Sequence, residues 1–234
     1  MDIAIIPARG GSKRIPRKNI KEFCGKPLIQ YSIEAALKSR QFDEVIISTD
    51  DQEICEIAIG LGATVPFIRP ETLSNDMTPT VPVVQHAIQK LSTQGWKIDY
   101  VACIYATAPF IEPNDLVKAN RVIRNQECVY SFPVCEHSSP IQRALIMNKG
   151  MQLSSMFPEN ELVRTQDFEP TYFDAGQFYV AHRETWMNNT RIHENGSAII
   201  IPKWRAVDID DLEDWAKAEM LYKSAGLYRM SSDK

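Results

Sequence analysis

Apolar runs rich in β-branched residues alternate with helix-period segments along the first half of the chain. Residues 2–8 (DIAIIPA) predict a buried strand, and residues 27–40 predict an amphipathic helix with Pro27 in its first turn. The same criteria predict strands at 44–49, 63–68 and 100–107 and helices at 51–61, 79–91 and 113–124. This alternation is typical of a three-layer α/β/α fold, Rossmann-like, whose mostly parallel sheet binds ligands beyond the carboxyl ends of its strands.

The alternation stops after residue 135. Residues 136–172 contain three prolines and only short apolar pieces. So long a stretch without periodicity is usually a functional segment or an interface arm. Regular patterns return with strands predicted at 176–181, 197–201 and 206–209 and a helix at 211–224. We therefore expect one domain over residues 1–234, with 136–172 inserted as an arm.

Composition narrows the class of protein. The formal net charge is −4, and a mildly acidic chain is a poor general binder of nucleic acid. The five cysteines are scattered and form no CxxC pair, which favours reduced thiols in a cytoplasmic protein. The first residues carry no basic leader, and no stretch of about 18 apolar residues occurs, so neither a signal peptide nor a membrane span is expected.

A basic, glycine-containing loop follows the first predicted strand. Five of the ten residues from Arg9 to Lys18 are cationic, and Gly10 and Gly11 allow backbone N–H groups to turn toward an anion. Phosphate binds at this position in nucleotide-handling α/β sheets. The loop matches neither the Walker A pattern nor GxGxxG, which disfavours P-loop ATPases and dinucleotide-dependent dehydrogenases. The alternative is a solvated basic turn.

The loop resembles the signature of a known family. Residues 6–19 (IPARGGSKRIPRKN), followed by residues 25–29 (GKPLI), are similar to the motif of the acylneuraminate cytidylyltransferases, and the similarity continues to the last helix. The resemblance implies that CTP lies over this loop and that Lys18 faces the reacting phosphate. Fixed cations there would stabilise charge that develops during phosphoryl transfer. The nucleotide-binding residues so implied are Ala8, Arg9, Gly10, Gly11, Ser12, Lys13, Lys18, Asn19, Arg69 and Thr80.

The last two of these residues belong to a second element, residues 69–80, which matches the family's RPxxLxxD segment. The resemblance implies that Arg69 and Thr80 help to recognise cytosine, whose O2 and N3 accept hydrogen bonds. The alternative for two neighbours is structural, because Asp76 or Thr78 could cap the helix that starts near residue 79.

An acidic pair precedes the last predicted helix. Asp208 and Asp210 are two residues apart on a predicted strand and would share a face, where both could hold Mg²⁺ together with phosphate oxygens. The family's closing DID motif has the same role, and with Arg9 and Lys18 the pair completes the expected catalytic set. The alternative is that Asp210 or Asp211 caps the helix, with Glu213 or Asp214 completing a capping box.

The four histidines show no metal-ligand spacing, so a zinc site is not expected.

The resemblance also bears on the acceptor sugar. Residues 103–109 (CIYATAP) stand where the sialic acid enzymes have QPTSP, and residues 174–179 (DAGQFY) replace an NGAIY-like strand. This combination resembles the pseudaminic acid branch, whose substrate suits a more aromatic pocket. Tyr105 and Gln177 are the expected sugar contacts, and Phe178 and Tyr179 could instead be core residues. Sialic acid, legionaminic acid and Kdo remain alternative substrates.

In the family, an arm of one subunit reaches over the partner's site. The resemblance therefore implies a homodimer in which Arg143 and Arg164, on the 136–172 arm, meet the carboxylate of an acidic nine-carbon sugar in trans. Either arginine could instead be a surface charge. A different class of function also stays open, namely a nucleotide-binding protein without catalytic activity.

Overall fold

A seven-stranded sheet forms the middle layer of the protein, which is described by a computed structural model over residues 1–125, 128–188 and 191–226. Its strands are β1 (Asp2–Pro7), β4 (Glu44–Ser48), β5 (Tyr100–Ile104), β6 (Ser131–Glu136), β9 (Tyr172–Asp174), β10 (Phe178–His182) and β11 (Ser197–Ile200). Their order is β11-β6-β10-β5-β1-β4, with β9 paired to β6. Strands β1, β4, β5, β6 and β11 run in one direction, and β10 and β9 run in the other.

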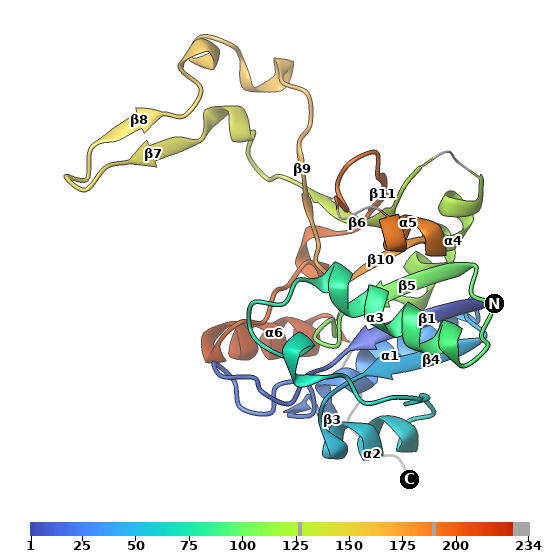
Figure 1. Ribbon diagram of the computed structural model, residues 1–234. Helices are drawn as coiled ribbons and strands as arrows, with labels where there is room; N and C mark the ends of the chain where they lie inside the picture. Colours follow the sequence, from blue (N-terminus) through green and yellow to red (C-terminus); the bar gives the residue numbers. More distant parts are fainter. Residues whose placement is uncertain (126–127, 189–190, 227–234) are drawn as a thin grey trace.

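Helices cover both faces of the sheet (Figure 1). They are α1 (Leu28–Ser39), α2 (Gln52–Gly60), α3 (Thr80–Thr93), α4 (Pro113–Asn125) and α5 (Arg183–Asn188), whereas α6 (Leu212–Ser224) packs elsewhere. Along β1, Ala4 and Ile6 pack in a core with α1, α2 and α4, whereas Ile3 and Ile5 pack with α3 on the other face. Because every second side chain of a strand points to the same face, this burial fixes β1 in the centre of the sheet. The expected three-layer fold with a mostly parallel sheet is confirmed.

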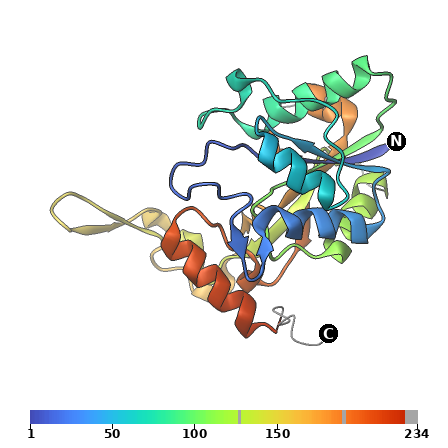
Figure 2. The ribbon, with the colours of Figure 1, turned by 90° about the horizontal axis from the view of Figure 1, so that it is seen from below.

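Helix α6 lies against the N-terminal loop rather than against the sheet (Figure 2). Trp215 of α6 and Ile209 just before it pack in a cluster with Ile15 and Phe23. Phe23 belongs to a short hairpin of β2 (Glu22–Phe23) and β3 (Lys26–Pro27). Ile209, Ile15 and Phe23 are each 0% exposed, so apolar burial holds the segment before α6 beside the glycine loop.

Most elements follow the sequence pattern, and two predicted strands do not form. Residues 63–68 make only isolated bridges, Ile46 to Thr64 and Thr49 to Ile68, and residues 206–209 form no strand. Within the seven-stranded sheet, β6 and β9 were not predicted, because β6 contains Pro133 and β9 is only three residues long. All five cysteines are free thiols. In the described parts of the chain, no helix combines the length and apolar character that a membrane span needs.

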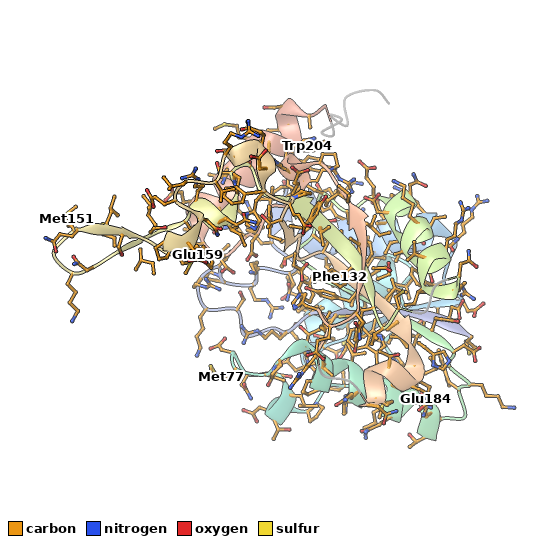
Figure 3. The ribbon with its side chains drawn as sticks, turned by 90° about the horizontal axis from the view of Figure 1, so that it is seen from above. Met77, Phe132, Met151, Glu159, Glu184 and Trp204 are labelled. Carbon is orange, nitrogen blue, oxygen red and sulfur yellow. The ribbon has the colours of Figure 1, made fainter. Side chains whose placement is uncertain are left out.

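Residues 137–171, here called the arm, leave the body between β6 and β9. The arm holds the hairpin β7 (Leu145–Met147) and β8 (Leu153–Ser155) and the short turns η2 (Ile141–Arg143), η3 (Pro158–Asn160) and η4 (Thr165–Asp167). It starts at the carboxyl end of β6, on the edge where β1, β4 and β5 also end. Figure 3 shows Met151 at its tip, well away from the body.

Candidate active site

A cleft of about 480 Å³ opens beyond the carboxyl ends of β1 and β5. These two strands are neighbours, and the chain passes from β1 to β4 on one side and later to β5 on the other. Such a reversal of strand order creates the crevice in which α/β sheets bind ligands. The polar and charged side chains that line it are Arg9, Ser12, Lys13, Arg14, Lys18, Asn19, Arg69, Asn75, Asp76, Thr78, Thr80, Tyr105, Thr107 and Asp210.

The two aspartates that follow β4 hold the glycine loop in place. The Gly10 N–H donates to Asp50 Oδ1 at 3.0 Å, and a Cβ at this position would collide with the Asp51 carboxylate, so only glycine fits. Arg17 forms an ion pair with Asp51, and hydrogen bonding to this guanidinium lowers the pKa of Asp51 to about 2. Asp51 also caps α2 by accepting from the Ile54 N–H. The loop is therefore fixed to the sheet edge and is not a free solvated turn.

Three further residues that were expected to bind the nucleotide differ in their relation to the cleft. Ala8 is 1% exposed and its N–H donates to Ser48 O at 2.9 Å, so its side chain does not reach the cleft. No side chain or backbone atom within the described chain lies near a Cβ built at Gly11. Asn19 lines the cleft, but its Nδ2 donates to Arg9 O at 2.9 Å and ties the two ends of the loop together.

Cations of the loop already contact an internal anion. Asp76 accepts from Arg9 at 2.5 Å and from Lys13 at 2.6 Å, and these bonds lower the pKa of Asp76. The capping alternative for Asp76 and Thr78 is wrong, because α3 follows Pro79 and makes no side-chain cap bond. The second nucleotide element thus closes one end of the cleft over the basic loop.

At the other end, the basic loop meets the acidic segment before α6. Lys18 Nζ donates to Ile209 O at 2.7 Å and lies 3.9 Å from the Asp210 carboxylate, and Arg14 pairs with Asp210 at 2.8 Å. Burial lowers the pKa of Lys18, an effect that the charges of Asp210 and Asp208 oppose. The structure therefore brings the expected catalytic cations and Asp210 together in one cleft.

Asp208 and Asp210 do not share a strand face, contrary to the prediction. They instead flank Ile209, which is fully buried in the α6 cluster, so both carboxylates are turned outward. Asp210 lines the cleft, while Asp208 is exposed beside it. Partial desolvation, reinforced by the charge of Asp210, raises the pKa of Asp208. Asp211 caps α6 and forms a capping box with Asp214, which confirms the alternative for that residue.

Residues expected to bind the base also line the cleft. Arg69 is 4% exposed, its Nε donates to Ser74 Oγ at 3.1 Å, and burial lowers its pKa. The Thr80 and Tyr105 hydroxyls are hydrogen-bonded to each other at 2.9 Å. Arg69, Thr80 and Tyr105 thus line the same cleft as the cations of the glycine loop.

Three residues assigned to the sugar lie elsewhere in this chain. Gln177 is 3% exposed and its Nε2 donates to Arg205 O at 2.7 Å, so it does not line the cleft. Arg143 lies on the arm, where it donates to Glu161 O and Val163 O at 2.9 and 2.5 Å. Arg164, also on the arm, pairs with Asp167 at 2.8 Å. The periodicity of residues 174–179 could not reveal that the Gln177 amide turns inward.

Sequence reasoning missed several residues of the site. Arg14 occupies a position left open in the family motif, yet it lines the cleft and pairs with Asp210. Asp50 accepts a hydrogen bond from the loop and Asp51 forms an ion pair with it, but neither residue lines the cleft. Their signal was available, since two carboxylates directly after a predicted parallel strand must lie at the ligand edge of the sheet.

Fold and cleft together define a phosphate-binding α/β protein in which a basic loop faces an acidic segment. The family model for cytidylyltransferases matches residues 3–191, so the chain belongs to the cytidylyltransferase family.

Several characterised proteins align with this chain over nearly its whole length. The chain is 43% identical over 223 residues to pseudaminic acid cytidylyltransferase of Campylobacter jejuni subsp. jejuni serotype O:2, which covers 95% of this chain and 96% of that protein. It is 29% identical to CMP-N,N'-diacetyllegionaminic acid synthase of Legionella pneumophila, over 94% and 95% of the two chains. A solved structure of CMP:2-keto-3-deoxy-manno-octonic acid synthetase complexed with CTP has the same fold, with a TM-score of 0.69, 19% identity, and coverage of 96% and 99%.

Proposed function

We propose that this protein transfers CMP from CTP to the anomeric hydroxyl of pseudaminic acid, forming CMP-pseudaminic acid and pyrophosphate. One observation carries the proposal: four cations of one loop line a single cleft together with Asp210 of the segment before α6. The substrate follows from two relatives named pseudaminic acid cytidylyltransferase, which are 43% and 42% identical over 95% of the chain.

The loop cations supply the electrostatic part of the reaction. The anomeric oxygen attacks the α-phosphorus and loses its proton to solvent, the bond from the α-phosphorus to the bridging oxygen breaks, and negative charge grows on the departing pyrophosphate. Arg9 and Lys13 are suited to hold the β- and γ-phosphates, and Lys18, beside the acidic segment, is suited to face the α-phosphate. Charges positioned in a partly desolvated cleft lower the barrier to this transfer.

Asp208 and Asp210 fit a hard divalent cation such as Mg²⁺. They are oxygen donors on either side of the buried Ile209, and burial, reinforced by the charge of Asp210, raises the pKa of Asp208. One or two carboxylates plus phosphate oxygens are the donor set that Mg²⁺ uses. When bound, the ion would neutralise phosphate charge and orient the triphosphate.

The sugar site needs more than one chain. Tyr105 lines the cleft, but Arg143 and Arg164 lie on the arm of the same chain and do not. Large apolar side chains on the arm are exposed, including Leu145 at 61%, Leu153 at 61% and Leu162 at 95%. Exposed apolar surface of this extent is typical of a protein interface. We propose a homodimer in which each arm reaches the cleft of the partner and brings an arginine to the sugar carboxylate.

The compartment follows from the thiols. All five cysteines are free thiols, which favours a reducing environment. We place the reaction in the cytoplasm.

The test is a panel of acceptor sugars. The purified protein is incubated with CTP and pseudaminic, legionaminic, sialic acid or Kdo, with Mg²⁺ or with EDTA, and pyrophosphate release is measured. We expect the highest kcat/KM for pseudaminic acid and no release with EDTA. Faster turnover of another sugar would refute the substrate. Binding of CTP without pyrophosphate release from any sugar would instead identify a nucleotide-binding protein without catalytic activity.

A further inference from the structure

A buried arginine stands directly before the acidic segment. Arg205 ends the short turn η5 (Lys203–Arg205) and is 4% exposed, although arginine is almost never buried in proteins unless it is paired. It is the middle one of three buried anchors spaced four residues apart, and the other two are Ile201 at 3% and Ile209 at 0% exposure. The carboxylates of the acidic segment lie on either side of Ile209, so their position depends on what holds this arginine.

The Arg205 guanidinium is held by the segment that leads into α4. Its Nε donates to Phe110 O at 3.0 Å, and one terminal nitrogen donates to Asp115 Oδ2 at 2.6 Å. The other terminal nitrogen lies 3.4 Å from the Glu112 carboxylate. The side chain of Asp115 is 3% exposed, so both partners of this ion pair are shielded from water. A planar fork of donors bonded in this way fixes orientation as well as position, which the single ammonium of a lysine does not.

The backbone of Arg205 is held from the sheet. Gln177 Nε2 donates to Arg205 O at 2.7 Å, and Gln177 O accepts from the Tyr105 N–H at 2.8 Å. Gln177 is 3% exposed, whereas Tyr105 lines the cleft. One buried glutamine therefore joins the arginine before the acidic segment to a residue of the cleft.

These contacts are directional, which sets them apart from the rest of the segment. A buried ion pair seldom adds stability over an apolar pair of the same volume, because both charges lose their hydration. Apolar burial, which holds the other two anchors, has no preferred direction, whereas hydrogen bonds to a guanidinium do. The bonds of Arg205 lead to Phe110 and, through Gln177, to Tyr105, and residues 105–107 line the cleft. They thus fix where the acidic segment lies relative to the loop after β5.

We propose that Arg205, with its partners Asp115 and Gln177, is a positioning residue that sets the carboxylates of Asp208 and Asp210 for a divalent cation bound together with the nucleotide. The inference rests on the proposed function, which assigns CTP and Mg²⁺ to the cleft. Residues that hold metal ligands in place typically change metal affinity by about 10-fold to 100-fold when they are replaced. Gln177 then acts on the acidic segment and not on the sugar.

The test measures metal binding without turnover. Mn²⁺ is the probe, because its electron spin resonance signal reports the free ion, and it is titrated into the protein with CTP and without sugar. Protein-free titrations correct for Mn²⁺ bound by CTP alone. Arg205→Lys keeps the charge and loses the fork, so the Mn²⁺ dissociation constant should rise about tenfold. Gln177→Met removes one hydrogen bond and should raise it about threefold. The CTP dissociation constant without metal, measured by calorimetry, should stay at the parent value.

A double variant separates position from stability. Asp115→Leu alone leaves the guanidinium buried without its carboxylate and should lower the unfolding temperature strongly. Asp115→Leu combined with Arg205→Met removes both charges, so it should lower the unfolding temperature much less than the single variant. The directional bonds are lost all the same, and the Mn²⁺ dissociation constant should rise by at least about tenfold.

The matched control removes a buried hydrogen bond on the other face of the sheet. Trp186 is 0% exposed, packs in the core that contains α3, and donates from Nε1 to Val101 O at 3.0 Å. Trp186→Phe loses this bond and should lower the unfolding temperature. It should leave the Mn²⁺ dissociation constant at the parent value, because it contacts neither Arg205 nor the acidic segment.

Three results overturn the inference. They are folded Arg205→Lys and double variants that bind Mn²⁺ as the parent does, an equal loss of Mn²⁺ binding in Trp186→Phe, and a parent protein that binds no Mn²⁺ with CTP. A parent that binds Mn²⁺ with CTP but releases no pyrophosphate with any sugar would refute the proposed function instead. In that case the Mn²⁺ titrations of the variants still decide whether Arg205 positions the acidic segment.

Discussion

The cleft and the arm are held by contacts of different range. In the cleft, Lys18 bonds to a carbonyl 191 residues away and Arg14 to a carboxylate 196 residues away. On the arm, Arg143 and Arg164 bond to groups 18, 20 and 3 residues away. The cleft is thus assembled by the whole fold, while the arm's bonds define only its local shape. The proposed function gives the two regions different roles, with the cleft binding the nucleotide and the arm completing the sugar site of a partner subunit.

The largest loss of kcat is expected from a substitution in the acidic segment that borders the cleft. Asp210→Asn removes a carboxylate that lines the cleft and pairs with Arg14, so kcat should fall by about 10²–10³-fold. The control is Asp211→Ala, one residue away, which loses the α6 cap and about 1 kcal/mol of stability but should keep kcat. Pyrophosphate release and urea unfolding give the two readouts. Equal loss of kcat in both variants would mean that the segment acts only through its fold.

Substitution of Lys18 should cause the next largest loss of kcat. Its side chain is 18% exposed and lies between the cleft and the acidic segment, where a charge interacts more strongly than in water. We expect Lys18→Ala to lower kcat by about 10²-fold and to change the CTP dissociation constant much less.

The matched control is Lys13→Ala. Lys13 is 81% exposed at the Asp76 end, and its loss should mainly weaken CTP binding. The reverse pattern, with Lys18→Ala affecting only binding, would remove Lys18 from the catalytic set.

The same contrast explains what the sequence could predict. The glycine loop is a contiguous motif after a strand, so its place at the ligand edge followed from pattern alone. Of the acidic pair, Asp210 lines the cleft and Asp208 does not, and the strand that was expected to align the two does not form. The two carboxylates point outward because Ile209 between them is buried against Ile15 and Trp215. This packing joins distant parts of the chain and gives the same alternation of buried and exposed positions as a strand. The inward turn of Gln177 and the inclusion of Arg14 also depend on tertiary neighbours, Arg205 and Asp210, that no local pattern contains.

The arm side of the comparison is tested by mixing two impaired variants at a sugar concentration well below the KM of the parent. Arg143→Ala should raise the sugar KM by at least about tenfold through loss of a charged contact made in trans. Mixed with Asp210→Asn and allowed to exchange subunits, it should regain roughly a quarter of the parent rate, since half the pairs are mixed and each has one intact site. Light scattering reports the dimer. No recovery in confirmed mixed dimers would show that Arg143 acts within its own chain or not at all.

The smallest expected effect is the change in unfolding free energy when either of two ion pairs is broken, Arg17–Asp51 beside the cleft or Arg164–Asp167 on the arm. Arg17→Ala releases Asp51, whose pKa is lowered from 3.8 to about 2 and whose side chain is 20% exposed, and should cost about 1–2 kcal/mol of unfolding free energy at pH 7 after allowance for solvent. Arg164→Ala breaks an exposed arm pair and should cost less than about 0.5 kcal/mol. A carboxyl group whose pKa is lower in the folded than in the unfolded protein stabilises the fold at pH values above its unfolded pKa. The loss of unfolding free energy in Arg17→Ala should therefore be constant above pH 4 and shrink as the pH falls toward 2. Urea titrations across this range measure both variants. Equal costs, or a deficit that does not change with pH, would mean that the loop is not held to the sheet edge by this pair and that cleft and arm differ less than their contacts indicate.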